Sequence, residues 1–179
     1  MKVLAISGSP RKGNTEAMLK RLLDGAKSKG AAIELVLLRD RKIELCDGCD
    51  TCWGTNKGCH IMDGMQPLYG KLFSADAIVF GSPNYFSNYS GLMKLFVDRL
   101  NPYCSPSRFR GKRAAIVCVG GQDLHHVKRC GQALQFVVKE LKMELVGSIV
   151  AKAEKPLEIL KNGKVMQQCF GLGEKLAEA

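Results

Sequence analysis

Four cysteines in the first third of the chain have the side chains best suited to metal binding or redox chemistry. Cys46, Cys49, Cys52 and Cys59 follow the pattern C-x2-C-x2-C-x6-C. Thiolates at this spacing can wrap one compact cluster, and iron–sulfur clusters are commonly held by four of them. Structural zinc is usually bound by two separated C-x2-C pairs, and this segment lacks a second separated pair. The pattern favours an iron–sulfur cluster and leaves open free thiols, a labile disulfide or a zinc site that includes His60.

A second group of residues has the composition of a phosphate-binding loop. Residues 7–15 (SGSPRKGNT) follow an apolar run and open a helical pattern. The small residues let backbone N–H groups approach an anion, and the helix N-terminus adds the positive end of a dipole. A Walker loop is excluded because Asn14 replaces its lysine, and G-x-G-x-x-G is excluded because Pro10 replaces its second glycine. We expect a phosphate monoester to be bound by Ser7, Ser9, Arg11, Lys12, Gly13, Asn14 and Thr15.

A third group is rich in aromatic and amide side chains and occupies residues 81–91 (GSPNYFSNYSG). Aromatic rings can contact the faces of a flat heteroaromatic ligand, while backbone groups bond its edges. Another apolar run ends in two glycines, which permit close approach of the backbone to a ligand. We expect a planar ring to be bound by Ser82, Pro83, Asn84, Tyr85, Phe86, Gly120 and Gly121.

The elements that must position these groups alternate between strands and helices. Apolar runs typical of buried strands lie at residues 2–7, 33–38, 77–81, 113–120 and 145–151. Helical patterns cover residues 14–29, 65–74, 91–100, 126–141 and parts of 157–179. Asn14 or Thr15 is expected to cap the first helix.

This alternation predicts one α/β domain over residues 1–179. We expect a flavodoxin-like three-layer sandwich whose five-stranded parallel sheet has the order 2-1-3-4-5. In that order a ligand lies at the switch point between the first and third strands, where the two polar loops meet. The cysteines fall in an irregular insertion at about residues 40–64, and a loop of that length usually has a functional reason.

Composition and charge limit the class of protein. The 179 residues are 46% hydrophobic and 25% charged, which is typical of a globular chain. The net charge of +10 comes from scattered lysines and arginines without a nucleic-acid-binding signature, so a solvated basic surface is favoured. No apolar run approaches the roughly 18 residues of a membrane span. We expect a cytoplasmic protein that binds neither nucleic acid nor membrane.

These motifs together resemble two related families. The loops GSPRKGNT and GSPNYFSNYSGLMKLFVDR and the strand end VGG look like the NADPH-dependent FMN reductase branch of the flavodoxin superfamily. The cysteine segment, with Asp63-Gly64-Met65 after it, resembles the iron–sulfur flavoproteins, although their usual acidic pair is here Asp63-Gly64. Asp98 and Arg99 match a pair in the reductases that we interpret as structural.

The resemblance implies cofactors and an assembly. FMN would be held at its phosphate by the first loop and at its isoalloxazine ring by residues 83–86, with Gly120 and Gly121 opposite. A 4Fe–4S cluster would be ligated by Cys46, Cys49, Cys52 and Cys59. The subunits would form a homodimer or homotetramer, in which electrons often pass between cluster and flavin across an interface.

Our leading hypothesis is an FMN-dependent oxidoreductase of the iron–sulfur flavoprotein type, with a ferredoxin-like protein as electron partner. One alternative is an NAD(P)H-dependent FMN or quinone reductase without a cluster, and another is a non-enzymatic flavodoxin-like electron carrier. The flavin would carry the chemistry, so no catalytic side chain is expected. His125 and His126 are interpreted as a surface pair near the mouth of the site, and Cys118 and Cys130 as core thiols.

Overall fold

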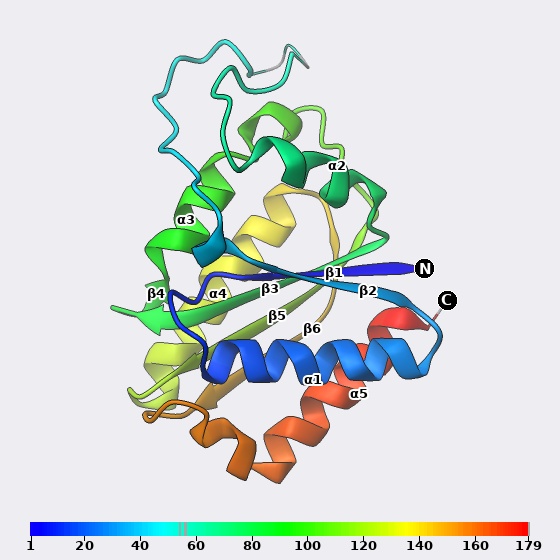
Figure 1. Cartoon of the computed structure of the whole chain (residues 1–179), viewed down its shortest axis with the longest axis vertical. Coiled ribbons are helices and arrows are strands. Elements are labelled where there is room, and N and C mark those ends of the chain that lie inside the picture. Colours follow the sequence, from blue (N-terminus) through cyan, green and yellow to red (C-terminus); the bar gives the residue numbers. More distant parts are fainter. Residues whose placement is uncertain (54, 56, 179) are drawn as a thin grey trace.

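A parallel β-sheet forms the centre of the computed structural model, which describes residues 1–53, 55 and 57–178 (Figure 1). Its parallel strands are β1 (Lys2–Ser7), β2 (Ala32–Leu37), β3 (Ala77–Tyr85), β5 (Arg113–Gly120) and β6 (Glu144–Lys152). They pair in the order β2-β1-β3-β5-β6, and the short strand β4 (Asn88–Tyr89) pairs antiparallel with β3. Counted without β4, this is the predicted order 2-1-3-4-5. The flavodoxin-like topology is therefore confirmed, with one hairpin strand that was not predicted.

Helices cover both faces of the sheet (Figure 1). The helices α1 (Asn14–Ser28) and α5 (Gly163–Ala177) lie on one face, and α2 (Gln66–Ser74), α3 (Gly91–Asp98) and α4 (Leu124–Glu140) on the other. Successive strand side chains point to opposite faces. Leu4 and Ile6 accordingly join the core on the α2–α4 side, while Val3 and Ala5 join the core against α1 and α5. The three-layer sandwich is confirmed.

Two glycines bring α1 and α5 into backbone contact. A Cβ atom added at Gly25 would lie 2.0 Å from the carbonyl oxygen of Phe170. One added at Gly173 would lie 1.9 Å from the carbonyl oxygen of Leu22. Only a glycine fits at either position, because the neighbouring atoms belong to the backbone and cannot move aside. This contact holds α1 against α5, and it thereby also supports the loop that precedes α1.

The starts of two helices differ from the predicted ones, because their first hydrogen bonds involve other residues. Gly13, rather than Asn14 or Thr15, is the N-cap of α1, and no side chain caps this helix. The predicted helix at 157–179 begins instead with a 3-10 turn (Glu158–Lys161), after which the Asn162 side chain accepts from Val165 N–H and starts α5. Residues 54 and 56 in the predicted insertion, and residue 179 at the predicted helix end, lie outside the described residues.

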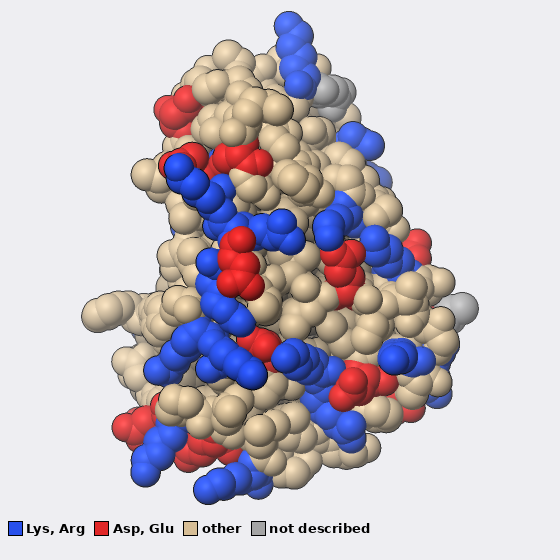
Figure 2. All heavy atoms as spheres, viewed as in Figure 1, with Lys and Arg blue, Asp and Glu red and all other residues tan. Residues whose placement is uncertain are grey.

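The surface is basic but mixed. On the face shown in Figure 2, lysines and arginines lie over α1 and the loop before it, with aspartates and glutamates between them. Within the described part of the chain, no helix combines the length and the apolar character that crossing a membrane requires.

Candidate functional site

The three sheet-end segments predicted to bind a ligand meet at one cleft. The β1–α1 loop, the end of β3 and the end of β5 border it together with the end of β6. Its lining residues are Ser9, Arg11, Asn14, Thr15, Pro83, Asn84, Tyr85, Val119, Gly120, Gly121, Ala153 and Glu154. Ala153 and Glu154, which directly follow β6, were not predicted, although the expected strand order places that strand beside β5. Wider grooves beside α5 and beside α1 do not gather polar groups from several strand ends.

The phosphate end of the cleft is built on the uncapped start of α1. The first N–H groups of a helix have no intrahelical partner, and here no side chain supplies one. Ser9 Oγ donates to the Arg11 carbonyl at 2.7 Å, which folds the loop tightly and leaves the Arg11 side chain exposed at the cleft. A dianion would meet free N–H donors, the positive end of the helix dipole and a guanidinium group.

Three of the predicted phosphate ligands have other placements. Ser7 is completely buried, and its Oγ accepts a hydrogen bond from Ser9 N–H, so it shapes the loop from below. Lys12 and Gly13 line the neighbouring groove beside α1. Neither belongs to the lining of the cleft.

Asn14 connects the cleft to the segment after β6. Its Nδ2 donates to the Lys155 carbonyl at 2.9 Å, and its Oδ1 accepts from Ile159 N–H at 3.2 Å. One N–H of the amide group remains for a ligand. These two bonds give Asn14 a structural role, and its role in phosphate binding stays a prediction.

A serine that was not singled out joins the two ligand loops. Ser90 Oγ donates to the Gly8 carbonyl at 2.6 Å and accepts from Met93 N–H as the N-cap of α3. Ser90 N–H in turn donates to Ser82 Oγ at 2.9 Å, and Ser82 is completely buried, so it supports the cleft from below. A serine directly before a helical pattern is the signal that could have identified this cap.

The ring end of the cleft contains an unsatisfied polar atom. Asn84 is 7% exposed, and its Nδ2 donates to Gln122 Oε1 at 2.7 Å. Its Oδ1 is buried and has no hydrogen-bond partner among the described residues. A buried acceptor without a donor costs free energy, which a ligand N–H at this position would recover.

Two aromatic residues that follow one another in the third-strand loop are accessible. Tyr85 is 45% exposed and Phe86 is 97% exposed, so neither ring is packed beneath the loop. Together with Asn84 and Gln122 they line a hollow that adjoins the main cleft and shares Asn84 and Tyr85 with it. The candidate site therefore combines one end whose groups suit an anion with another end lined by aromatic and amide side chains.

The four predicted cysteine ligands lie around a separate hollow in the insertion. Cys46, Cys49, Cys52 and Cys59 all line it. Burial raises the pKa of the Cys52 thiol, and the neighbouring thiols add to this shift because their negative charges would repel. Bound cations would reverse that repulsion and favour the thiolates. The donor set is thus chemically suited to a sulfur-ligated metal centre.

A mixed donor set lies at the same hollow. One ligand atom each from Asp47, Cys49 and His60 falls within 4.8 Å of the others, and His60 Nε2 lies 2.9 Å from Asp47 Oδ2. These three residues could also hold a single metal ion.

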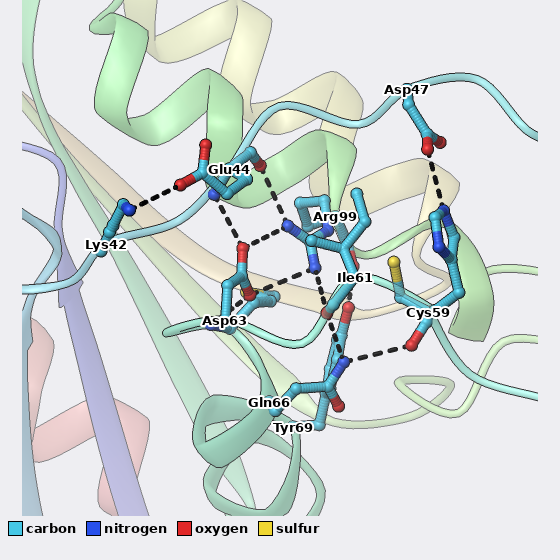
Figure 3. Close-up of polar contacts among 11 residues, drawn as sticks. Lys42, Glu44, Asp47, Cys59, Ile61, Asp63, Gln66, Tyr69 and Arg99 are labelled. Atoms are coloured by element: carbon cyan, nitrogen blue, oxygen red, sulfur yellow. Dashed lines mark hydrogen bonds and ion pairs between the residues drawn. The ribbon is translucent and has the colours of Figure 1, made fainter.

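A buried ion pair closes the base of the cysteine insertion (Figure 3). The guanidinium of Arg99, which is completely buried, bonds both carboxylate oxygens of Asp63 at 2.6 and 3.2 Å. Arg99 also donates to the Glu44 and Ile61 carbonyls, which lie on the two limbs of the insertion. Burial alone would raise the pKa of Asp63, but hydrogen bonds from Arg99 and from two backbone N–H groups outweigh it and lower the pKa.

The structural role predicted for Arg99 is confirmed by these contacts, whereas its partner Asp63 was not predicted. Asp98 points elsewhere and pairs with Lys94 on the exposed side of α3. The ion pair joins the chain entering the insertion to the chain leaving it, so it holds the cysteine segment to the domain.

Comparisons with known proteins find related sequences. A family model described as NADPH-dependent FMN reductase matches residues 1–156. An iron–sulfur flavoprotein of Archaeoglobus fulgidus is 32% identical over 180 residues, which cover 100% of this chain and 80% of that protein. One from Methanocaldococcus jannaschii is 36% identical over 121 residues, covering 67% of this chain. That match spans 62% of the M. jannaschii protein, less than two thirds of its length.

A solved structure supports the fold alone. The two-electron reduced flavodoxin of Megasphaera elsdenii superimposes with a TM-score of 0.65 at 20% identity, covering 99% of each chain.

Proposed function

Because this chain belongs to the family of NADPH-dependent FMN reductases and iron–sulfur flavoproteins, we propose that it is an FMN-dependent oxidoreductase with a 4Fe–4S cluster in its cysteine insertion. When bound, the flavin would exchange two electrons with a substrate, and the cluster would pass electrons singly to or from a partner. The chain's own residues bind and orient these groups.

The observation that carries the FMN assignment is the composition of one cleft. Its two ends match the two ends of the cofactor, with free helix N–H groups and Arg11 for the phosphate. Tyr85, Phe86 and the unsatisfied Asn84 Oδ1 are available to the flavin ring. The glycines after β5 let backbone approach that ring from the other side.

The chain would contribute to the reaction by positioning. Ser90 joins the two loops through Gly8 and Ser82, so the phosphate end and the ring end keep a fixed separation. The Asn84–Gln122 hydrogen bond orients the amide at the ring end. No side chain in the cleft needs to act as an acid or base for electrons to pass through a flavin.

The cluster assignment rests on the four thiols that line one hollow. Their sequence spacing and their shared position both suit a single cluster. The names of the relatives from A. fulgidus and M. jannaschii point in the same direction. A second candidate is a cluster-free NAD(P)H-dependent flavin or quinone reductase with one metal ion in the insertion, which the Asp47, Cys49 and His60 donor set favours.

Iron, sulfide and flavin counts on protein purified without oxygen separate these candidates. The proposal predicts flavin absorption bands, a broad iron–sulfur shoulder and about four irons and four sulfides per chain. Flavin with one zinc and no sulfide would support the second candidate, and the absence of flavin would reject both.

NADPH is the reductant that the family description suggests, and a ferredoxin-like protein is our proposed single-electron partner. We also propose that the chain works as a homodimer or homotetramer. Turnover of NADPH with a quinone or ferredoxin, and light scattering of the purified protein, test these points.

A further inference from the structure

The histidine pair at the start of α4 is not used by the proposed function, yet one of its rings is bonded to the ring end of the cleft. His126 Nδ1 lies 2.8 Å from Ser87 Oγ, within hydrogen-bond distance. Ser87 follows Phe86 in the turn between β3 and β4. His126 thus connects the β5–α4 junction to the loop whose aromatic residues line the site.

The turn that His126 contacts has an unfavourable backbone conformation. Phe86 has φ of 50° and Ser87 has φ of 63°, a left-handed region that residues with a Cβ rarely adopt. Two-residue hairpin turns of this kind normally use Asn-Gly or Gly-Gly. Strain at non-glycine residues persists where surrounding contacts impose it, and such positions cluster at ligand sites. The Phe86-Ser87 turn therefore needs support from outside its own sequence.

The hairpin itself offers little of that support. Only two residue pairs, Asn84 with Tyr89 and Tyr85 with Asn88, join β3 to β4. The Phe86 ring is 97% exposed and so gains almost nothing from packing. Two side-chain hydrogen bonds connect the hairpin to the β5–α4 junction, from Asn84 to Gln122 at its base and between Ser87 and His126 at its tip.

We propose that His126 is a positioning residue for flavin binding, acting through Ser87 to hold the strained Phe86-Ser87 turn at the ring end of the cleft. The inference rests on the proposed FMN site and deepens it. His126 does not touch the reacting atoms, and its effect falls on the ring rather than the phosphate. Its neighbour His125 is exposed, with its ring 3.8 Å away between centroids and no hydrogen bond to a described residue.

Flavin affinity measured by fluorescence quenching tests this role. His126→Ala should weaken binding of FMN and of riboflavin by the same factor, about fivefold, because both share the ring. His126→Asn should recover most of the loss, since its amide can still bond a hydroxyl. Ser87→Ala should weaken binding to a similar extent, and adding His126→Ala to it should cost nothing further. His125→Ala is the matched control and should bind like the wild type.

Equal flavin affinity in His126→Ala and His125→Ala would overturn the proposal, as would a loss for FMN alone. Amide hydrogen exchange in the flavin-free protein separates this failure from failure of the proposed function. Residues 86–89 should exchange faster in His126→Ala than in His125→Ala, whether or not a flavin binds. If the wild type binds no flavin, the proposed function fails, and unchanged exchange rejects the role of His126 independently.

Discussion

Replacing Asp63 by Asn should destabilise the protein strongly, although the two side chains have nearly the same size. The carboxylate accepts four hydrogen bonds: two from Arg99, at 2.6 and 3.2 Å, and one each from the backbone N–H groups of Glu44 and Met65. Asparagine keeps one acceptor oxygen and turns an NH2 group toward these donors. Arg99 would then be a buried charge without a counter-charge.

Removing one partner of a buried ion pair typically costs about 3–5 kcal/mol. Arg99 retains the Glu44 and Ile61 carbonyls as acceptors, so we expect a loss at the lower end, about 3 kcal/mol. In urea unfolding followed by circular dichroism, this corresponds to a midpoint lower by about 1–2 M. Asp98→Asn, at the end of α3 and next to Arg99 in the sequence, is the matched control. It removes only the exposed ion pair with Lys94 and should cost no more than about 0.5 kcal/mol.

The same variant should respond differently to acid. The pKa of Asp63 is lower in the folded protein, so the ion pair contributes its stability above the ordinary aspartate pKa of about 3.9. That contribution is lost as the pH falls through the lower folded pKa, and the difference between wild type and Asp63→Asn should shrink with it. The reasoning is refuted if Asp63→Asn unfolds within about 0.5 kcal/mol of the wild type at neutral pH.

Three further expectations concern the phosphate end of the cleft, the β1–α1 loop and the cysteine insertion. Arg11→Ala should weaken FMN about tenfold and leave riboflavin unchanged, as fluorescence titration of both ligands would show, because a charged hydrogen bond to phosphate is lost. Gly8→Ala should cost about 1–3 kcal/mol in urea unfolding, since its Cβ would lie 2.8 Å from Met93 Cβ, whereas Gly70→Ala, with open space around it, should be neutral or stabilising. Cys59→Ser should remove most of the iron from anaerobically purified protein, while Cys104→Ser, outside the four-cysteine pattern, should retain it; equal iron in the two would argue against the ligand set.

The sheet, and the meeting of the three predicted ligand segments at one of its edges, could be predicted because their sequence signals are local. The buried strands are continuous apolar runs. The β1–α1 loop can be recognised from its small residues and from the helical pattern that follows it. What could not be predicted depends on contacts between distant segments. In the sequence Asp63 is an ordinary loop residue, because its partner Arg99, which directly follows α3, lies 36 positions later.

The β3–β4 hairpin was missed for the opposite reason, because its local sequence argues against it. Phe86-Ser87 is not a typical hairpin turn sequence, and Ser87 in this turn is within hydrogen-bond distance of His126 at the start of α4. Asn14 shows the same limit, since its hydrogen bonds to Lys155 and Ile159 span more than 140 positions. Side-chain partners of this kind depend on how the chain folds, so the spacing of residues in the sequence does not predict them.

The glycine contact between α1 and α5 also sets an order of events during synthesis. Within this chain α1 leaves the ribosome long before α5, and Gly25 and Gly173 can meet only after α5 has emerged. At usual translation rates that interval is on the order of ten seconds. Throughout it, the apolar side of α1, including Met18 and Leu22, lacks its final cover. The β1–α1 loop should therefore lack the support of the α1–α5 contact until α5 has emerged and packed.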